Sequence, residues 1–289
     1  MSFSAPGSPP PPQPQPQPGL PPYGAAPHPA PHLAPHPAPP QAGGPLPGQP
    51  YPAQGQYPGP PYPYPPQLVD VLRSPQGLAT ALTVVLSVTA AVDLFSAGAN
   101  VYARSLMTDL IADRDTVSEG SLNLSDVMTG AAGSLQLLTV LGTAALFITW
   151  FHRVRVNGEI FRRDGFTRTR GWAIGGWFVP IGNLFIPYQT ALEIWAASTQ
   201  QAPDGSYRRV STAPVTAWWA LWVLAAISDR VFSVLYARAE TPETLRSASS
   251  VGIVSDLLTV AAAVLAIVFV RRLTALQNTK AAQGPNAAL

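Results

Sequence analysis

The chain has no cysteine and almost no lysine. Without cysteine, disulfides, thiol catalysis and cysteine-ligated metals are excluded. Of its 17 basic residues all but Lys280 are arginine. The sequence also has no Gly-rich phosphate loop, no HExxH or GxSxG motif and no pair of carboxylates in a catalytic setting. We therefore expect a protein that is not an enzyme and that carries neither a cofactor nor a metal ion.

Residues 1–69 lack charged side chains altogether. They contain 27 of the 34 prolines, and Gln, Gly, Ala and Tyr fill most of the remainder. A segment with so little aliphatic surface cannot offset the entropy lost on ordering, so we predict a disordered tail. Its proline spacing suits polyproline II docking to a cytosolic protein, and the alternative is an entropic spacer. No secretory signal peptide is expected, because no apolar core of such a signal is present.

The rest of the chain contains long apolar runs. Four runs without internal proline are each long enough to cross a bilayer, which takes about 20 residues. A further apolar region, 172–197, contains Pro180 and Pro187, and a proline removes a backbone hydrogen bond from a helix. This broken segment is either a kinked fifth span or a re-entrant or interfacial segment that returns to the side it came from. The four uninterrupted runs cover about 78–102, 127–151, 215–236 and 251–270.

The distribution of basic residues separates these alternatives, because cytoplasmic connections collect Lys and Arg. Four crossings place twelve basic residues inside and four outside, whereas five crossings give nine and seven, so four crossings are favoured. The same positive-inside pattern explains the basic balance better than nucleic-acid binding, and we expect no nucleic-acid partner. The twelve inside residues are Arg73, Arg153, Arg155, Arg162, Arg163, Arg168, Arg170, Arg208, Arg209, Arg271, Arg272 and Lys280.

The predicted fold is an all-α polytopic transmembrane helical bundle of four spans plus the broken segment. The transmembrane domain covers 70–275, between the tail 1–69 and a short cytoplasmic C-terminal tail, 276–289. The protein is expected to be a multi-pass protein of the cell (plasma) membrane with both termini in the cytoplasm. A faint repeat supports two parallel hairpins, because the sequence around Asp93 resembles that around Asp229. Chance similarity between apolar segments is the competing explanation.

The block from Trp150 to Trp195 is the most distinctive part of the chain. A Trp and a basic cluster are followed by an Asn, then by the pattern Trp-x-x-Pro-x-x-Asn-x-x-x-Pro, then by another Trp. This block resembles a family of bacterial integral membrane proteins known as domain of unknown function 4328, common in high-GC Gram-positive bacteria. The resemblance covers about 78–275 and implies a multi-pass membrane protein, but it implies no activity. The motif residues are Trp150, Arg153, Asn157, Trp177, Pro180, Asn183, Pro187 and Trp195.

Several polar residues in or near the apolar runs are candidates for function. Ionisable groups inside a bilayer are costly and often mark ion or proton paths, although interfacial or paired structural charge is the simpler explanation. These candidates are Asp93, Glu193, Asp229 and Asp256. Asn183 lies between two prolines, where it either coordinates an ion at a broken helix or caps the helix from about Leu184 to Ala197. We favour the cap.

Arginines and tryptophans gather near the predicted span ends. The arginines are candidate contacts for anionic lipid head groups, beyond their role in topology. The seven tryptophans fit interfacial anchoring. The candidate head-group residues are Arg153, Arg155, Arg162, Arg163, Arg168 and Arg170.

The predicted function is that of a membrane-anchored interaction or scaffold protein without catalysis. Its expected partners are the lipid bilayer, a cytosolic protein that recognises the Pro-rich tail, and other copies of the chain in a homo-oligomer. The first alternative is a small channel or transporter that uses the break between Pro180 and Pro187, with Asn183 and Glu193. The second is an intramembrane enzyme, which has the least support.

Overall fold

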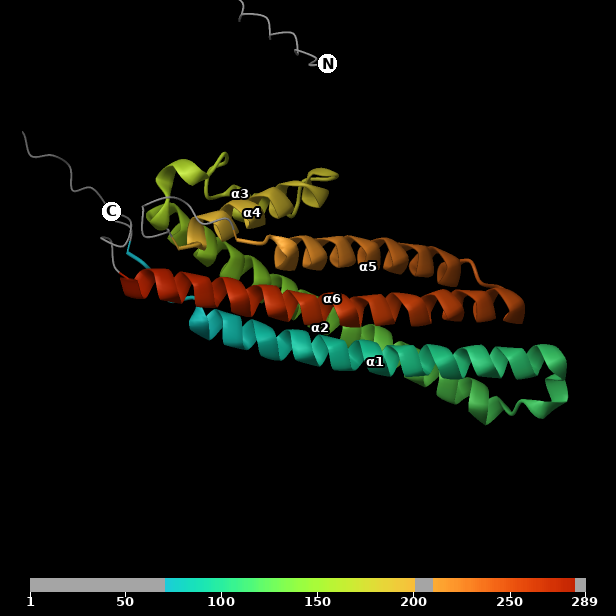
Figure 1. Ribbon diagram of the computed structural model, residues 1–289. Helices are drawn as coiled ribbons and strands as arrows, with labels where there is room; N and C mark the ends of the chain where they lie inside the picture. The colour runs from blue at the N-terminus through green and yellow to red at the C-terminus, as the bar shows by residue number, and fades with distance from the viewer. Residues whose placement is uncertain (1–70, 201–209, 284–289) are drawn as a thin grey trace, which may run out of the picture. The chain divides into compact units, whose positions relative to one another are not determined.

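Four long helices make up most of the computed structural model, which describes residues 71–200 and 210–283 (Figure 1). Each of the four is long and apolar enough to cross a membrane. This part of the chain contains no strand, so the all-α prediction with four spans is confirmed. The predicted tail, 1–69, and the pair Arg208 and Arg209 lie outside the described residues. The four helices are α1 (Gln76–Ala112), α2 (Glu119–Phe161), α5 (Ala213–Ala237) and α6 (Pro242–Gln283).

The helices are not packed symmetrically. Helix α1 packs against α2 and α6, and α6 packs against α1 and α5, whereas α2 and α5 make at most marginal contact. Figure 1 shows α1, α6 and α5 side by side, with their axes nearly aligned. The bundle is therefore closed where α1 packs on α6, whereas α2 and α5 meet through side chains and line cavities in a groove between them.

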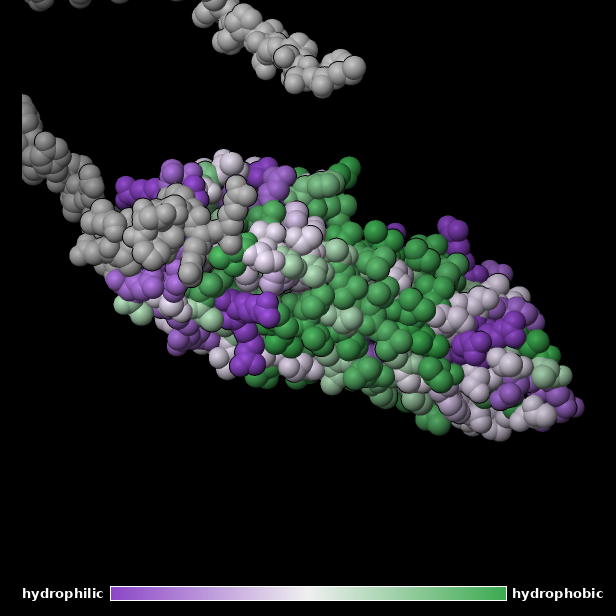
Figure 2. Space-filling view, in the orientation of Figure 1, coloured by the Kyte–Doolittle hydropathy of each residue, from purple (hydrophilic) through white to green (hydrophobic). Residues whose placement is uncertain are grey.

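The bundle has two distinct ends. The connection after α2, the start of α1, the start of α5 and the end of α6 lie at the end that we call the arginine-rich end (Figure 1). The α1–α2 and α5–α6 connections lie at the other end, which we call the hairpin end. Figure 2 shows a broad apolar surface over the middle of the helices, with polar residues toward both ends, as expected for a protein that crosses a bilayer.

The helices extend beyond the predicted spans. The predicted 103–126 loop is mostly helical, because α1 continues to Ala112 and α2 begins at Glu119, capped by the Ser118 hydroxyl 3.1 Å from the Ser121 amide. The first part of the expected C-terminal tail, 276–289, is helical, since α6 continues to Gln283. Hydropathy predicts only the part of a helix that lies in lipid, whereas a helix ends where its backbone hydrogen bonds end.

The broken segment does not form a spanning helix. It consists of α3 (Trp172–Gly175), the 3-10 turn η3 (Gly182–Leu184) and α4 (Ile186–Ser198), and it starts and finishes at the arginine-rich end. Ile181 at its tip has φ 63°, a strained value for a β-branched residue, and its side chain is 76% exposed. The expected cap is wrong: neither η3 nor α4 has a side-chain cap, and α4 begins after Phe185.

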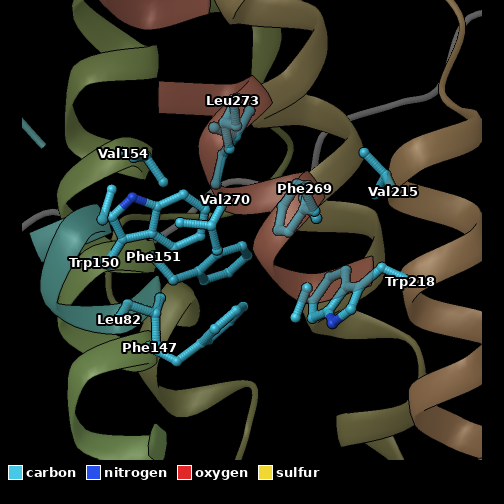
Figure 3. Packing of buried hydrophobic residues seen from close by; sticks show 14 of the residues in the cluster. Leu82, Phe147, Trp150, Phe151, Val154, Val215, Trp218, Phe269, Val270 and Leu273 are labelled. Carbon is cyan, nitrogen blue, oxygen red and sulfur yellow. The ribbon is translucent and has the colours of Figure 1, made fainter. Parts of the chain in front are cut away.

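The core lies at the arginine-rich half and is aromatic. Trp218 of α5 stacks on Phe269 of α6 with ring centroids 4.6 Å apart, and Phe147 of α2 lies 5.4 Å from Trp218 (Figure 3). Trp150 is fully buried in the same cluster. Interfacial anchoring is therefore the wrong explanation for the buried tryptophans, which hold the helices together. These are Trp150, Trp195, Trp218 and Trp219, all at most 7% exposed.

Candidate functional site

Two buried aspartates meet in the hairpin-end half of the bundle. The Gln136 amide nitrogen on α2 donates to Asp93 Oδ1 on α1 at 2.9 Å and to Asp256 Oδ1 on α6 at 3.0 Å. Asn100 Nδ2 donates to the other oxygen of Asp256 at 3.0 Å. Asp93 is 3% exposed and Asp256 7%. Three helices thus bring two carboxyl groups and two amides together, and we call these four residues the acidic cluster.

One carboxyl oxygen of the acidic cluster has no partner. Both oxygens of Asp256 accept hydrogen bonds, but Asp93 Oδ2 is buried and accepts none from the part of the chain that the structure describes. Asp93 and Asp256 line a cavity of about 330 Å³ in the groove between α2 and α5. Asp229 of α5 lines the same cavity from its more exposed rim. Asp93 is therefore the carboxyl group of the acidic cluster that can still accept a hydrogen bond or a cation.

Close contact between α1 and α6 holds the acidic cluster together. A Cβ added to Gly252 of α6 would lie 2.8 Å from the Asn100 side-chain oxygen. Glycine at this position leaves room for the Asn100 amide beside α6, one helical turn from Asp256. A larger side chain at position 252 would therefore displace the Asn100 amide, which donates to Asp256.

The charge of the cavity is one-sided. Asp93, Asp229 and Asp256 line it, and among the described residues no Arg or Lys does so. A bare carboxylate away from water is costly, so these groups need protons or a bound cation for neutralisation. Within residues 71–200 and 210–283 no three His, Asp or Glu side chains are placed to hold a metal ion. The arrangement suits a proton, a monovalent cation or a cationic organic group.

A second polar network ties the arginine-rich end together. Buried Gln277 of α6 donates to the Val154 carbonyl of α2 at 2.8 Å and to the Ser198 hydroxyl of α4 at 3.2 Å. Its oxygen accepts from Asn157 Nδ2 at 3.1 Å. Lys280 Nζ donates to carbonyls at the end of α4, including that of Ala197 at 2.8 Å. These bonds join three helices, α2, α4 and α6.

The arginines do not form a uniform head-group surface. Arg155 is 2% exposed, donates to Glu159 at 3.0 Å and lies 3.6 Å from the Phe166 ring centroid. Head-group contact is therefore wrong for Arg155, because its side chain is enclosed by protein. Arg170 donates to the same Glu159 oxygen at 2.6 Å, while Arg163 is exposed. Head-group contact by Arg153, Arg162, Arg163, Arg168 and Arg170 stays a prediction.

Glu159 lies beyond the predicted span 127–151 and is the acid of this ion-pair network. Burial alone would raise the pKa of its carboxyl group. The hydrogen bond from Arg170 and the positive charges of Arg155 and Arg170 outweigh burial and lower that pKa. Glu159 is therefore held in its ionised form.

The predicted acidic candidates divide into two groups. Asp93, Asp229 and Asp256 line one cavity, whereas Glu193 of α4 lies at the arginine-rich end. Glu193 Oε1 accepts from the Thr167 hydroxyl at 2.6 Å and from its amide at 3.2 Å, so it fastens the connection between α2 and α3 to α4. Its other oxygen is buried without a partner among the described residues, as Asp93 Oδ2 is. Asn183 does not line that cavity.

Residues of the Trp150–Trp195 motif pack in the arginine-rich half of the bundle. Trp150 donates to the Thr274 hydroxyl at 3.2 Å, and Asn157 joins the Gln277 network. Trp177 contacts Trp222 of α5 edge to face, with centroids 5.8 Å apart. Arg153 reaches the Ser74 carbonyl at 3.4 Å. Pro187 and Trp195 are buried in α4, while Pro180 and Asn183 belong to the tip region between α3 and α4.

Sequence reasoning missed Gln136 and Asn100. Both are amides within apolar helices, at positions where a neutral side chain attracts less attention than an acid. Polar amides between membrane helices commonly form interhelical hydrogen bonds. That property was the available signal, but it does not say which acid each amide reaches.

Comparisons with known proteins give one match. The search of curated proteins found no match, and neither did the search of solved structures. The profile of the family described as Domain of unknown function (DUF4328) matches residues 113–275, more than half of the chain. The matched region contains Gln136, Asp229 and Asp256, whereas Asp93 and Asn100 on α1 precede it. On this match, the chain belongs to the DUF4328 family.

Proposed function

We propose that the protein is a cation-binding membrane protein of the channel or transporter class. The observation that carries this proposal is that Asp93, whose buried Oδ2 has no partner among the described residues, lines one cavity together with Asp256 and Asp229. Ionisable residues at membrane depth are expensive and are retained where they bind ions, relay protons or hold a counter-ion. The proposed activity involves no catalysis.

The proposed site is the acidic cavity and not the broken segment. The transporter hypothesis from the sequence used Asn183 and Glu193, but Glu193 is engaged with Thr167 and does not line the acidic cavity. The broken segment packs instead against the aromatic core through Trp177. We assign it the role of closing the arginine-rich half between α2 and α5.

Cytoplasmic orientation of the arginine-rich end is part of the proposal. The distribution of basic residues supports it, and an even number of spans then places both termini in the cytoplasm of a cell whose plasma membrane holds the protein. Fluorescent and alkaline phosphatase reporters fused after Leu289 test this. Phosphatase activity outside the cytoplasm from that fusion would reverse the orientation.

The test of cation binding is charge displacement by the full-length protein on a solid-supported membrane. Jumps in proton, sodium or potassium concentration should give a current from the wild-type protein for at least one cation. Asp93→Asn should abolish it, because the substitution removes the charge and keeps the shape. Glu193→Gln is the matched control and should keep the current. Absence of current from folded wild-type protein, or the same current from Asp93→Asn, overturns the proposal.

A second function is favoured by one sequence observation. Residues 1–69 have the proline spacing that aromatic grooves of adaptor domains recognise, which supports a membrane-anchored scaffold. Deletion of residues 1–66 separates the two functions. A scaffold should lose its cytosolic partners or its cellular position, whereas the cation current should survive. Association of copies of the chain into a homo-oligomer stays a prediction.

A further inference from the structure

An apolar cavity adjoins the acidic one. It measures about 290 Å³ and is lined almost entirely by apolar atoms, including the rings of Phe147, Trp177, Trp218 and Trp222. It shares four wall residues with the acidic cavity, so the two are neighbours along the same groove. The shared residues are Val140, Trp222, Thr259 and Ala262.

The two cavities favour different chemical groups in a ligand. The acidic side offers Asp93 Oδ2, a buried acceptor without a partner, and no basic wall residue. The apolar side offers aromatic surface, which attracts apolar bodies and also cations through its negative ring faces. An inorganic cation would leave the aromatic cavity without an occupant, and a neutral lipid chain would leave the carboxylate without a counter-charge.

We propose that the groove between α2 and α5 binds an amphipathic organic cation, with its positive group at Asp93 and its apolar body against Trp222 and Trp218. This inference rests on the proposed function, because it names the substrate class of the same acidic site. Small-molecule sites are commonly apolar cavities of roughly 300–1,000 Å³ with a few polar groups that fix orientation. The neighbouring cavities match that description.

Lateral access supports a ligand that partitions into lipid. The backbones of α2 and α5 make at most marginal contact, and the side chains that bridge them, Phe147, Trp177 and Trp218, lie in the arginine-rich half. The apolar wall residues Leu137 and Val140 are 61% and 55% exposed on α2. A hydrophobic amine or quaternary cation concentrates in the bilayer, and it reaches Asp93 from there without crossing the aromatic core.

The test uses a matched pair of ions on the full-length protein in nanodiscs. Tetraphenylphosphonium and tetraphenylborate have the same shape and opposite charge, and tetramethylammonium supplies the charge without the aromatic body. Calorimetry should show saturable binding of tetraphenylphosphonium, with affinity for each of the other two ions at least tenfold weaker. Equal binding of tetraphenylborate would mean that only hydrophobicity is recognised and would overturn the inference.

Variants locate the site. Asp93→Asn and Trp222→Ala should each weaken tetraphenylphosphonium binding at least tenfold. Asp109→Asn and Trp172→Ala change the same residue types at exposed positions outside both cavities, and they should bind like the wild type. Thermal unfolding and size-exclusion elution establish that each variant is folded. Trp222→Phe replaces Trp222→Ala where the latter unfolds, with a smaller expected loss.

The outcomes separate this inference from the proposed function. Proton- or sodium-driven currents that depend on Asp93, without tetraphenylphosphonium binding, would refute the organic cation and retain a cation site. Binding that depends on both Asp93 and Trp222 supports the organic cation whatever the inorganic currents show. Binding that is unaffected by Asp93→Asn refutes it.

Discussion

The arginine-rich half and the hairpin-end half of the bundle differ in the groups that surround their buried acids: Glu159 pairs with Arg155 and Arg170, whereas Asp93 and Asp256 are bound by amides. In the first half, Gln277, Asn157 and Lys280 are buried with their side-chain polar groups bonded to neighbouring helices. In the second, Asp93 is equally buried and keeps one carboxyl oxygen without a partner. A fully hydrogen-bonded polar network stabilises one arrangement of the helices. A buried charged group with an unpartnered atom destabilises the protein until a ligand or a proton binds to it. Glu193 Oε2 in the arginine-rich half is also buried without a hydrogen-bond partner among the described residues, but the positive charge of Arg155 acts on Glu193, whereas the acidic cavity has no basic residue among its described wall residues.

The aromatic core of the arginine-rich half should give the largest loss of stability. Trp218→Ala removes a ring stacked 4.6 Å from Phe269 and 5.4 Å from Phe147. The free energy of unfolding should fall by about 3–5 kcal/mol, as for other buried aromatic residues. Unfolding in mixed detergent micelles measures it. The control Trp172→Ala, at a side chain 40% exposed, should change it by less than about 1 kcal/mol.

The Gln277 polar network of the arginine-rich half should give the second-largest loss of stability. Gln277→Ala removes three hydrogen bonds, with the Val154 carbonyl, the Ser198 hydroxyl and the Asn157 amide. We expect a loss of about 2–3 kcal/mol in the free energy of unfolding, because each of the three buried hydrogen bonds contributes about 1 kcal/mol. Thr279→Ala on an exposed part of α6 is the control. A loss no larger than the control's would mean that this network does not stabilise the bundle.

The ion-pair network should show a pH-dependent effect. At neutral pH, Glu159→Gln should destabilise the protein by about 1–2 kcal/mol, because Arg155 and Arg170 lose their common partner. The lowered pKa of Glu159 means that its contribution is present above the ordinary value of 4.5 and is lost as pH falls through the folded-state pKa. The stability difference between variant and wild type should therefore shrink in acid. A difference that stays constant down to pH 3 would contradict this.

The hairpin-end half should respond with the opposite sign. Asp93→Asn removes a buried charge and keeps an oxygen that accepts from Gln136. We expect unfolding stability to stay the same or rise by about 1 kcal/mol, since a buried charge without a full set of partners costs stability. The same detergent unfolding assay measures it. A loss as large as that of Gln277→Ala would abolish the distinction between the two halves.

Much of the fold follows from the sequence. The four spans lie within α1, α2, α5 and α6, because an apolar run of bilayer length has few alternatives to a helix in lipid. The two prolines correctly mark the segment that does not cross. Helix ends were less accurate, since the polar turns beyond the lipid are not distinguished from loops by hydropathy.

The candidate site was predicted only in part. Asp93, Asp229 and Asp256 were identified because acids in apolar runs are conspicuous, and the structure places them around one cavity. Glu193 was chosen by the same rule, yet it fastens the loop at Thr167. Selecting acids in apolar runs uses only the energetic cost of placing a charge in an apolar segment. It contains no information on which side chains come into contact in the folded protein. Gln136, which joins two of the acids, was missed for that reason.

The sequence by itself determined that this chain is built for a bilayer, with four spans and a basic end, because hydropathy and charge act residue by residue along the chain. Tertiary structure decided that α2 and α5 stand apart, and that Asp93 and Asp256 share the amide of Gln136. Such meetings depend on the rotation and order of helices, which are set by packing at contacts such as that of Gly252 with Asn100. No local pattern in the chain encodes them.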